Sequence, residues 1–249
     1  MWTYLAIFLC VFFLLLVFVR RLVITLTKKP ETEESSTPET PQKTGSTPKQ
    51  RLSKDEKTEL QRLYKRSLAL IKKKDPKEAV KILVQALAVD PLYLDALREL
   101  GKLYLDQKMW GKASAVYTTL SEKTDDPVDF SHLGLAFYNA GELDDAAKAY
   151  QEAISRDPKR HQRYISLGCV YLDSEKPPLA LIAFNKALEK EPDNVDYMLL
   201  LANAHKSMAQ FDDAKQILEK AIKANPMGKM AKKVLEEIEQ AEKDEGSKQ

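Results

Sequence analysis

Large apolar side chains recur every three or four positions between residues 54 and 243, which is the spacing of one face of an α-helix. A small residue stands among them at a nearly constant interval, with steps of 33, 34 and 34 residues. These small residues are Gly101, Gly134, Gly168 and Ala202. Each is followed after twelve positions by an alanine: Ala113, Ala146, Ala180 and Ala214. The pattern predicts pairs of amphipathic helices that repeat about every 34 residues.

Each predicted helix pair is too small to bury its own apolar face, so neighbouring pairs must stack on one another. Proline ends three of the units, at Pro158, Pro192 and Pro226, because it cannot continue a helix. A 34-residue helix–turn–helix period with small, aromatic, alanine and proline residues at fixed positions resembles the tetratricopeptide repeat (TPR). The resemblance implies an all-α fold, a right-handed superhelical solenoid of about five repeats with a C-terminal capping helix.

The repeat boundaries follow from the small residues and the prolines. The five predicted repeats cover residues 54–91, 92–125, 126–158, 159–192 and 193–226. A capping helix over 227–243 and a flexible tail over 244–249 complete the domain. Ser53 and Glu56 have the spacing of a capping box, which predicts the start of the first helix. The register is irregular between the second and third repeats, so we expect a rearranged turn over 124–127 without a break in the stack.

The N-terminal stretch differs in character from the repeats, because residues 1–19 are uncharged and almost wholly apolar. A helix needs about 20 such residues to cross a bilayer. We interpret residues 1–27 as an uncleaved transmembrane anchor, since no basic residue precedes the stretch and no signal-peptidase site follows it. Its four nearby Lys and Arg residues all lie on the C-terminal side, so the positive-inside rule predicts a single-pass membrane protein with the repeats facing the cytoplasm. Residues 28–53, rich in Thr, Pro, Glu, Ser and Lys, are predicted to form a disordered linker.

Composition and motifs argue against catalysis and nucleic-acid binding. Acidic and basic residues nearly cancel, for a net charge of +2, whereas nucleic-acid-binding domains usually carry a strongly basic stripe. The three histidines, His132, His161 and His205, lack metal-ligand spacing, and no phosphate-binding loop or nucleophile motif occurs. We therefore predict a protein that is not an enzyme and that has no cofactor, no metal and no small-molecule substrate.

The TPR resemblance implies a concave groove, lined by the first helix of each repeat, that binds proteins or peptides. The residues that its positions assign to this groove are Arg98, Lys102, Leu135, Tyr138, Ile165, Leu172, Asn203 and Lys206. The four apolar members form the expected centre of the groove, and Lys102 and Lys206 lie toward its ends. The carboxylate clamp with which some TPR proteins bind chaperone C-termini is incomplete, because only Lys102 and Asn203 match it.

The leading functional interpretation is a non-enzymatic, membrane-anchored adaptor or scaffold that recruits protein partners to a membrane surface. The plan resembles bacterial inner-membrane TPR proteins, some of which act in envelope assembly. A mitochondrial outer-membrane protein receptor is an alternative with the same order of segments. A third interpretation is a regulatory subunit of a membrane enzyme, which would pair through the transmembrane helix.

Overall fold

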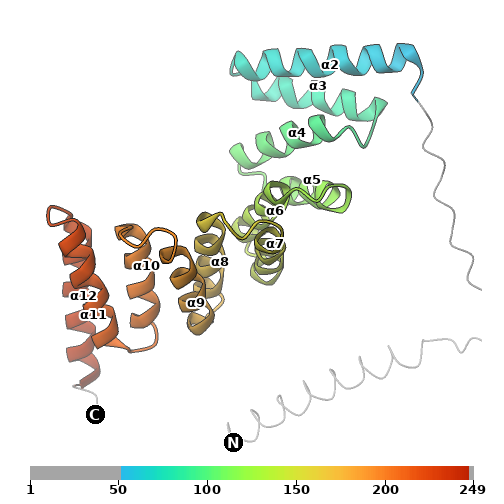
Figure 1. Cartoon of the computed structure of the whole chain (residues 1–249). Helices are drawn as coiled ribbons and strands as arrows, with labels where there is room; N and C mark the ends of the chain where they lie inside the picture. Colours follow the sequence, from blue (N-terminus) through green and yellow to red (C-terminus); the bar gives the residue numbers. More distant parts are fainter. Residues whose placement is uncertain (1–51, 247–249) are drawn as a thin grey trace, which may run out of the picture. The chain divides into compact units, whose positions relative to one another are not determined.

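The computed structural model describes residues 52–246, and these fold entirely into helices and short turns (Figure 1). The eleven helices within this range are α2 (Lys54–Lys72), α3 (Pro76–Val89), α4 (Leu94–Asp106), α5 (Trp110–Lys123), α6 (Pro127–Ala140), α7 (Leu143–Arg156), α8 (His161–Asp173), α9 (Pro177–Leu188), α10 (Val195–Lys206), α11 (Phe211–Ala224) and α12 (Lys229–Gly246). None of them is long and apolar enough to span a membrane. The predicted anchor (1–27) and the predicted linker up to residue 51 lie outside the described residues.

Each helix from α3 to α11 packs against the one before it and the one after it, so that five helix pairs and α12 form a continuous stack (Figure 1). The core is divided into clusters that join neighbouring pairs. One of them unites Ala180 and Phe184 of α9 with Leu201 and Ala204 of α10. No pair buries its apolar face alone, as the sequence pattern requires. The predicted all-α solenoid is confirmed for this part of the chain.

The first helix begins where the capping box predicts. The Ser53 backbone N–H donates to Glu56 Oε2 at 2.8 Å, and the Glu56 N–H donates to Ser53 Oγ at 3.2 Å. Both bonds satisfy backbone donors that have no partner inside the helix. The other end of the stack differs from the prediction, because α12 continues three residues past 243, to Gly246. The helix thus includes the first three residues of the predicted flexible tail, 244–246, and the rest of that tail lies outside the described residues.

The closest approach within a helix pair joins a glycine of the first helix to a ring of the second. At Gly134 an added Cβ would lie 2.9 Å from the ring of Tyr150, which is shorter than real Cβ contacts. At Gly168 the ring of Phe184 is closer still, and Phe184 is fully buried. The predicted close crossing of the two helices at Gly168 is therefore confirmed.

The turn inside each helix pair places one residue in the left-handed region of backbone space. These residues are Lys74, Lys108, Gly141, Glu175 and Ala209, all with φ between 54° and 82°. Their spacing follows the repeat, yet a single glycine occurs among them. Positive φ costs a non-glycine residue of order 1 kcal/mol, so the sequence carries no strong local signal for this conformation.

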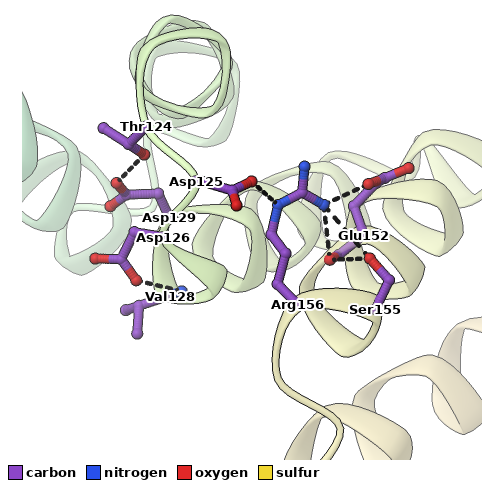
Figure 2. A network of polar contacts seen from close by, with 8 residues as sticks. All are labelled: Thr124, Asp125, Asp126, Val128, Asp129, Glu152, Ser155 and Arg156. Carbon is purple, nitrogen blue, oxygen red and sulfur yellow. Dashed lines mark hydrogen bonds and ion pairs between the residues drawn. The ribbon is translucent and has the colours of Figure 1, made fainter.

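The irregular segment between the second and third pairs forms an ordered polar turn (Figure 2). The side chain of Asp126 caps α6 by accepting from the Val128 N–H at 2.9 Å, and the Thr124 hydroxyl donates to Asp129 at 2.8 Å. From the neighbouring helix α7, Arg156 Nε donates to Asp125 at 2.6 Å, while its Nη1 reaches Glu152. Helices α5 and α6 remain packed together, so the predicted rearranged turn without a break is confirmed.

The contact at Gly168 generates a stability prediction. Gly168→Ala should lower the free energy of unfolding of fragment 51–249 by about 1–3 kcal/mol, because the buried ring of Phe184 has no room to move away. Denaturant unfolding followed by far-UV circular dichroism measures the change. The control is Gly111→Ala in α5, where an added Cβ meets no atom within 4 Å and should be neutral or slightly stabilising. Equal effects of the two substitutions would contradict the assigned crossing.

Candidate binding surfaces

The residues assigned to the groove lie on four helices, each the first helix of its pair. Arg98 and Lys102 belong to α4, Leu135 and Tyr138 to α6, Ile165 and Leu172 to α8, and Asn203 and Lys206 to α10. Three of them are exposed and differ from the rest in being free of core packing: Lys102, Leu135 and Asn203. The other five are partly buried.

Arg98 joins two repeats. Its Nη2 donates to Asp129 Oδ2 at 2.9 Å and its Nε to Asp129 Oδ1 at 3.2 Å, and Asp126 lies 3.4 Å from Nη2. Asp129 is 2% exposed, so Arg98 neutralises a buried carboxylate of the next helix pair. The bond to Asp129 raises the pKa of Arg98 above its ordinary value, so the guanidinium stays charged. Arg98 therefore contributes first to stacking, and only its exposed edge can meet a ligand.

Tyr138 also joins neighbouring repeats. Its hydroxyl donates to Asp173 at the end of α8, with an O···O distance of 2.6 Å, and its ring packs against a cluster that includes Tyr150 and Leu167. The hydrogen bond to Asp173 raises the pKa of the Tyr138 phenol well above its usual range. Truncation of Tyr138 would remove a contact between helix pairs, so loss of binding in such a variant would have two causes.

Ile165 and Leu172 pack toward the following repeat. Both contact the cluster formed by Phe184 of α9 and Leu201 of α10. Leu135, by contrast, is 38% exposed and contacts no core cluster. The four residues predicted as an apolar centre are thus divided by the fold, and Leu135 is the one most open to a ligand.

Sequence reasoning missed a further polar contact on the same helices. Arg163 is 3% exposed; its Nε donates to Ser131 of α6 at 3.0 Å and its Nη1 donates to Asp157 at 2.7 Å. An arginine in the first turn of an amphipathic helix reads as surface charge, and no sequence signal distinguishes a buried one. Its side chain ties α8 to α6, as Arg98 ties α4 to α6.

A second surface, outside the predicted groove, is an apolar hollow of about 300 Å³ formed by α7, α8 and α9. Its lining residues are Gln151, Ile154, Ser155, Tyr164, Leu167, Tyr171, Leu179, Ile182, Ala183 and Lys186. Leu179 and Ile182 are 43% and 61% exposed, which is unusual for large apolar side chains. The Gln151 amide bonds the Tyr171 hydroxyl at 2.6 Å and holds α7 against α8 at this surface. The available sequence signal was that α9 is apolar on more than one face.

Cys169 and His132 are the described thiol and imidazole whose pKa values burial shifts. Burial raises the pKa of the Cys169 thiol, which disfavours the reactive thiolate. Burial lowers the pKa of His132, whose ring lies against that of Tyr117. Within residues 52–246, no group of three His, Cys, Asp or Glu side chains could hold a metal ion.

The geometry defines a helical-repeat solenoid, a class of protein that presents long surfaces to partners. One sequence model of the tetratricopeptide repeat matches residues 70–133 and 171–238, and a second matches residues 132–195. The chain belongs to the tetratricopeptide repeat family, as the resemblance implied.

Curated relatives share this family but are much longer. Human protein O-mannosyl-transferase TMTC3 is 29% identical over 180 residues, which cover 66% of this chain and 20% of TMTC3. The peroxisomal targeting signal receptor of Komagataella phaffii is 30% identical over 87 residues, 34% of this chain and 15% of the receptor. Among solved structures, MamA matches with a TM-score of 0.66 at 21% identity and covers 68% of this chain and 93% of MamA. The chain thus spans a fifth or less of these two curated relatives, and the MamA likeness shows the fold alone.

The Arg98–Asp129 pair generates a second stability prediction. Arg98→Ala should destabilise fragment 51–249 by about 2–4 kcal/mol, because it strands a buried carboxylate that keeps only the Thr124 hydroxyl as a side-chain partner. Denaturant midpoints at neutral pH measure the effect. The control is Arg62→Ala, which breaks an exposed pair with Glu59 and should change stability by less than about 0.5 kcal/mol. If both variants unfold at the same denaturant concentration, the role assigned to Arg98 is wrong.

Proposed function

We propose that this chain is a non-catalytic scaffold that binds segments of partner proteins on the surface of its first helices and holds them at a membrane. The observation that carries the proposal is a row of side chains one position after each small residue. The row consists of Lys102, Leu135 and Asn203, which are exposed, and Cys169, which is partly buried, on α4, α6, α10 and α8 respectively. Equivalent positions of stacked repeats share one face, so these residues form a line that crosses four helix pairs. An extended segment with an apolar side chain near its centre suits such a line.

The relatives support protein or peptide partners. The Komagataella phaffii protein is named as a receptor for a targeting signal, and this chain matches part of it. The transferase named in TMTC3 is a far longer protein, of which this chain covers a fifth. The carboxylates of this chain have non-catalytic explanations: Asp144 and Asp145, for example, stand in the first turn of α7, where the helix dipole favours negative charge.

Membrane attachment is the part of the proposal that rests on sequence. Residues 1–19 lack charge, and the basic residues follow on one side, which favours a single-pass anchor with the repeats in the cytoplasm. That arrangement would suit a role in bacterial envelope assembly or, as the alternative, a receptor of the mitochondrial outer membrane. A regulatory subunit would instead bind its enzyme through residues 1–27, and binding would then survive every change in the repeats.

The test of the row uses a random peptide library displayed on phage and selected on fragment 51–249, which forms a compact unit. Leu135→Asp should lower the affinity of the fragment for the selected peptides by about tenfold or more, because it places a charge at the apolar centre. Val84→Asp is the matched control, since Val84 is a similarly exposed apolar residue of α3, outside the row. Circular dichroism of both variants establishes that the fold is retained. Peptides that bind Leu135→Asp at full strength would refute the row as the binding surface.

The hollow between α7 and α9 is a second candidate surface, favoured by the exposure of Leu179 and Ile182. Ile182→Asp should lower the affinity for any peptide that inserts an apolar side chain into the hollow by about tenfold or more. It should leave the affinity for peptides that bind at the row unchanged. The same selected peptides measure both outcomes by fluorescence anisotropy. A peptide that depends on Ile182 and not on Leu135 assigns binding to the hollow; the reverse assigns it to the row.

A further inference from the structure

The helix α2 carries a stripe of basic side chains along one face, which we call the lysine stripe. Its members are Lys54, Lys57, Gln61, Lys65, Leu68 and Lys72. Their spacing of three, four, four, three and four residues keeps them on one side of the helix. All six side chains are exposed, and none of the four lysines lies within salt-bridge distance of an acidic group of the described residues. The stripe is therefore a line of uncompensated positive charge.

Two of the three acidic residues of the same helix are engaged, and the third, Asp55, lies on another side of the helix from the stripe. Glu56 is bonded to Ser53 in the capping box, and Glu59 is bonded to Arg62. Burial raises the pKa of Tyr64, which borders the stripe, and the charges of Asp95 and Glu99 on α4 raise it further. Glu99 is also paired with Lys102. Among the described residues no ion pair holds the stripe lysines, so their charge is open to a partner from outside the repeats.

The charge is concentrated in this part of the chain. Residues 54–81 contain ten Lys or Arg and five Asp or Glu, a net charge of +5, whereas the whole chain carries +2. The remaining residues are thus slightly acidic as a set. Although the charges of the whole chain nearly cancel, the end of the stack that begins with α2 is basic (Figure 1).

We propose that the lysine stripe binds an anionic membrane surface, so that α2 lies along the bilayer. The proposal rests on the membrane anchor proposed above. Lys54 and Lys72 lie about 27 Å apart along the helix, so the stripe is a straight line of charge suited to a flat charged surface. Leu68, which is 38% exposed and lies between Lys65 and Lys72 in the stripe, can contact the apolar boundary of the headgroups. The 26 residues from 28 to 53 separate the apolar segment from α2, and a flexible chain of that length spans about 28 Å. The stripe therefore begins within reach of the bilayer that the anchor would enter.

An acidic polypeptide is the other partner that such charge would attract. The membrane is favoured because the lysines form a straight line along an exposed helix face, and because the stripe directly follows residues 28–53 in the sequence. Lysines near an anionic bilayer act as independent charges, each of which raises the binding constant about fivefold. The attraction is screened by salt over about 8 Å at physiological ionic strength.

The experiment uses the full chain with Cys10 and Cys169 replaced by alanine and a fluorophore on Gln61→Cys. The protein is reconstituted with vesicles of phosphatidylcholine alone or with about 30% phosphatidylserine, both with a quencher on a fraction of the headgroups. Quenching should be stronger on the anionic vesicles and should be lost in about 1 M salt. Lys57→Gln/Lys65→Gln should reduce the ratio of docked to undocked label about 25-fold. A label at Gln85→Cys on α3 should stay unquenched.

The matched control is Lys220→Gln/Lys223→Gln in α11, which removes two exposed charges outside the stripe and should leave quenching unchanged.

Flotation separates this proposal from the anchor. A chain that floats with neutral vesicles but shows equal quenching on both kinds has an anchor, and the stripe proposal is then wrong. A chain that floats only with anionic vesicles, and only with the stripe intact, supports the stripe and refutes the anchor. If polyglutamate protects the Gln61→Cys label and vesicles do not, the stripe binds acidic polypeptide and the membrane proposal fails.

Discussion

The structure depends on the contact between a small residue of one helix and a large ring of the next. Gly101, Gly134 and Gly168 each lie against the ring of Tyr117, Tyr150 or Phe184, with no room for a Cβ. At Tyr117 the packing of the ring determines the position of the side chain. Its hydroxyl is buried without a hydrogen-bond partner in the described part of the chain. A buried hydroxyl without a partner costs about 1–3 kcal/mol, so the ring must contribute more than this through packing.

Polar residues on the first helices are divided between stacking and function. Arg98, Tyr138 and Arg163 each join their own helix pair to a neighbouring one through a carboxylate or hydroxyl. These contacts explain how this stack carries charge on its first helices without leaving all of it free for ligands. What remains exposed after stacking, such as Leu135 and Asn203, is the surface on which a partner would be distinguished.

Three surfaces of the described unit thus differ in chemistry. The row across α4 to α10 is mixed, with lysine, leucine, cysteine and asparagine. The hollow between α7 and α9 is apolar, and the stripe on α2 is cationic. Because neighbouring repeats contact only each other, one end of a solenoid can meet a membrane while other repeats bind protein.

The sequence by itself determined the helical period, the helix pairs and the crossing at Gly168, because these depend on local spacing and on the size of a few side chains. It also located the capping box at Ser53 and the irregular turn at 124–127, whose residue types act on their immediate neighbours. Only the tertiary structure decided that Arg163 is buried, that Ile165 and Leu172 pack onto the next repeat, and that Leu179 and Ile182 line a hollow. These properties depend on which residues of the adjacent repeat contact a side chain. The position of that side chain within its own helix does not determine those contacts. The left-handed turns at Lys74 and Glu175 belong to the same group, since the two packed helices impose a conformation that their own residues do not favour.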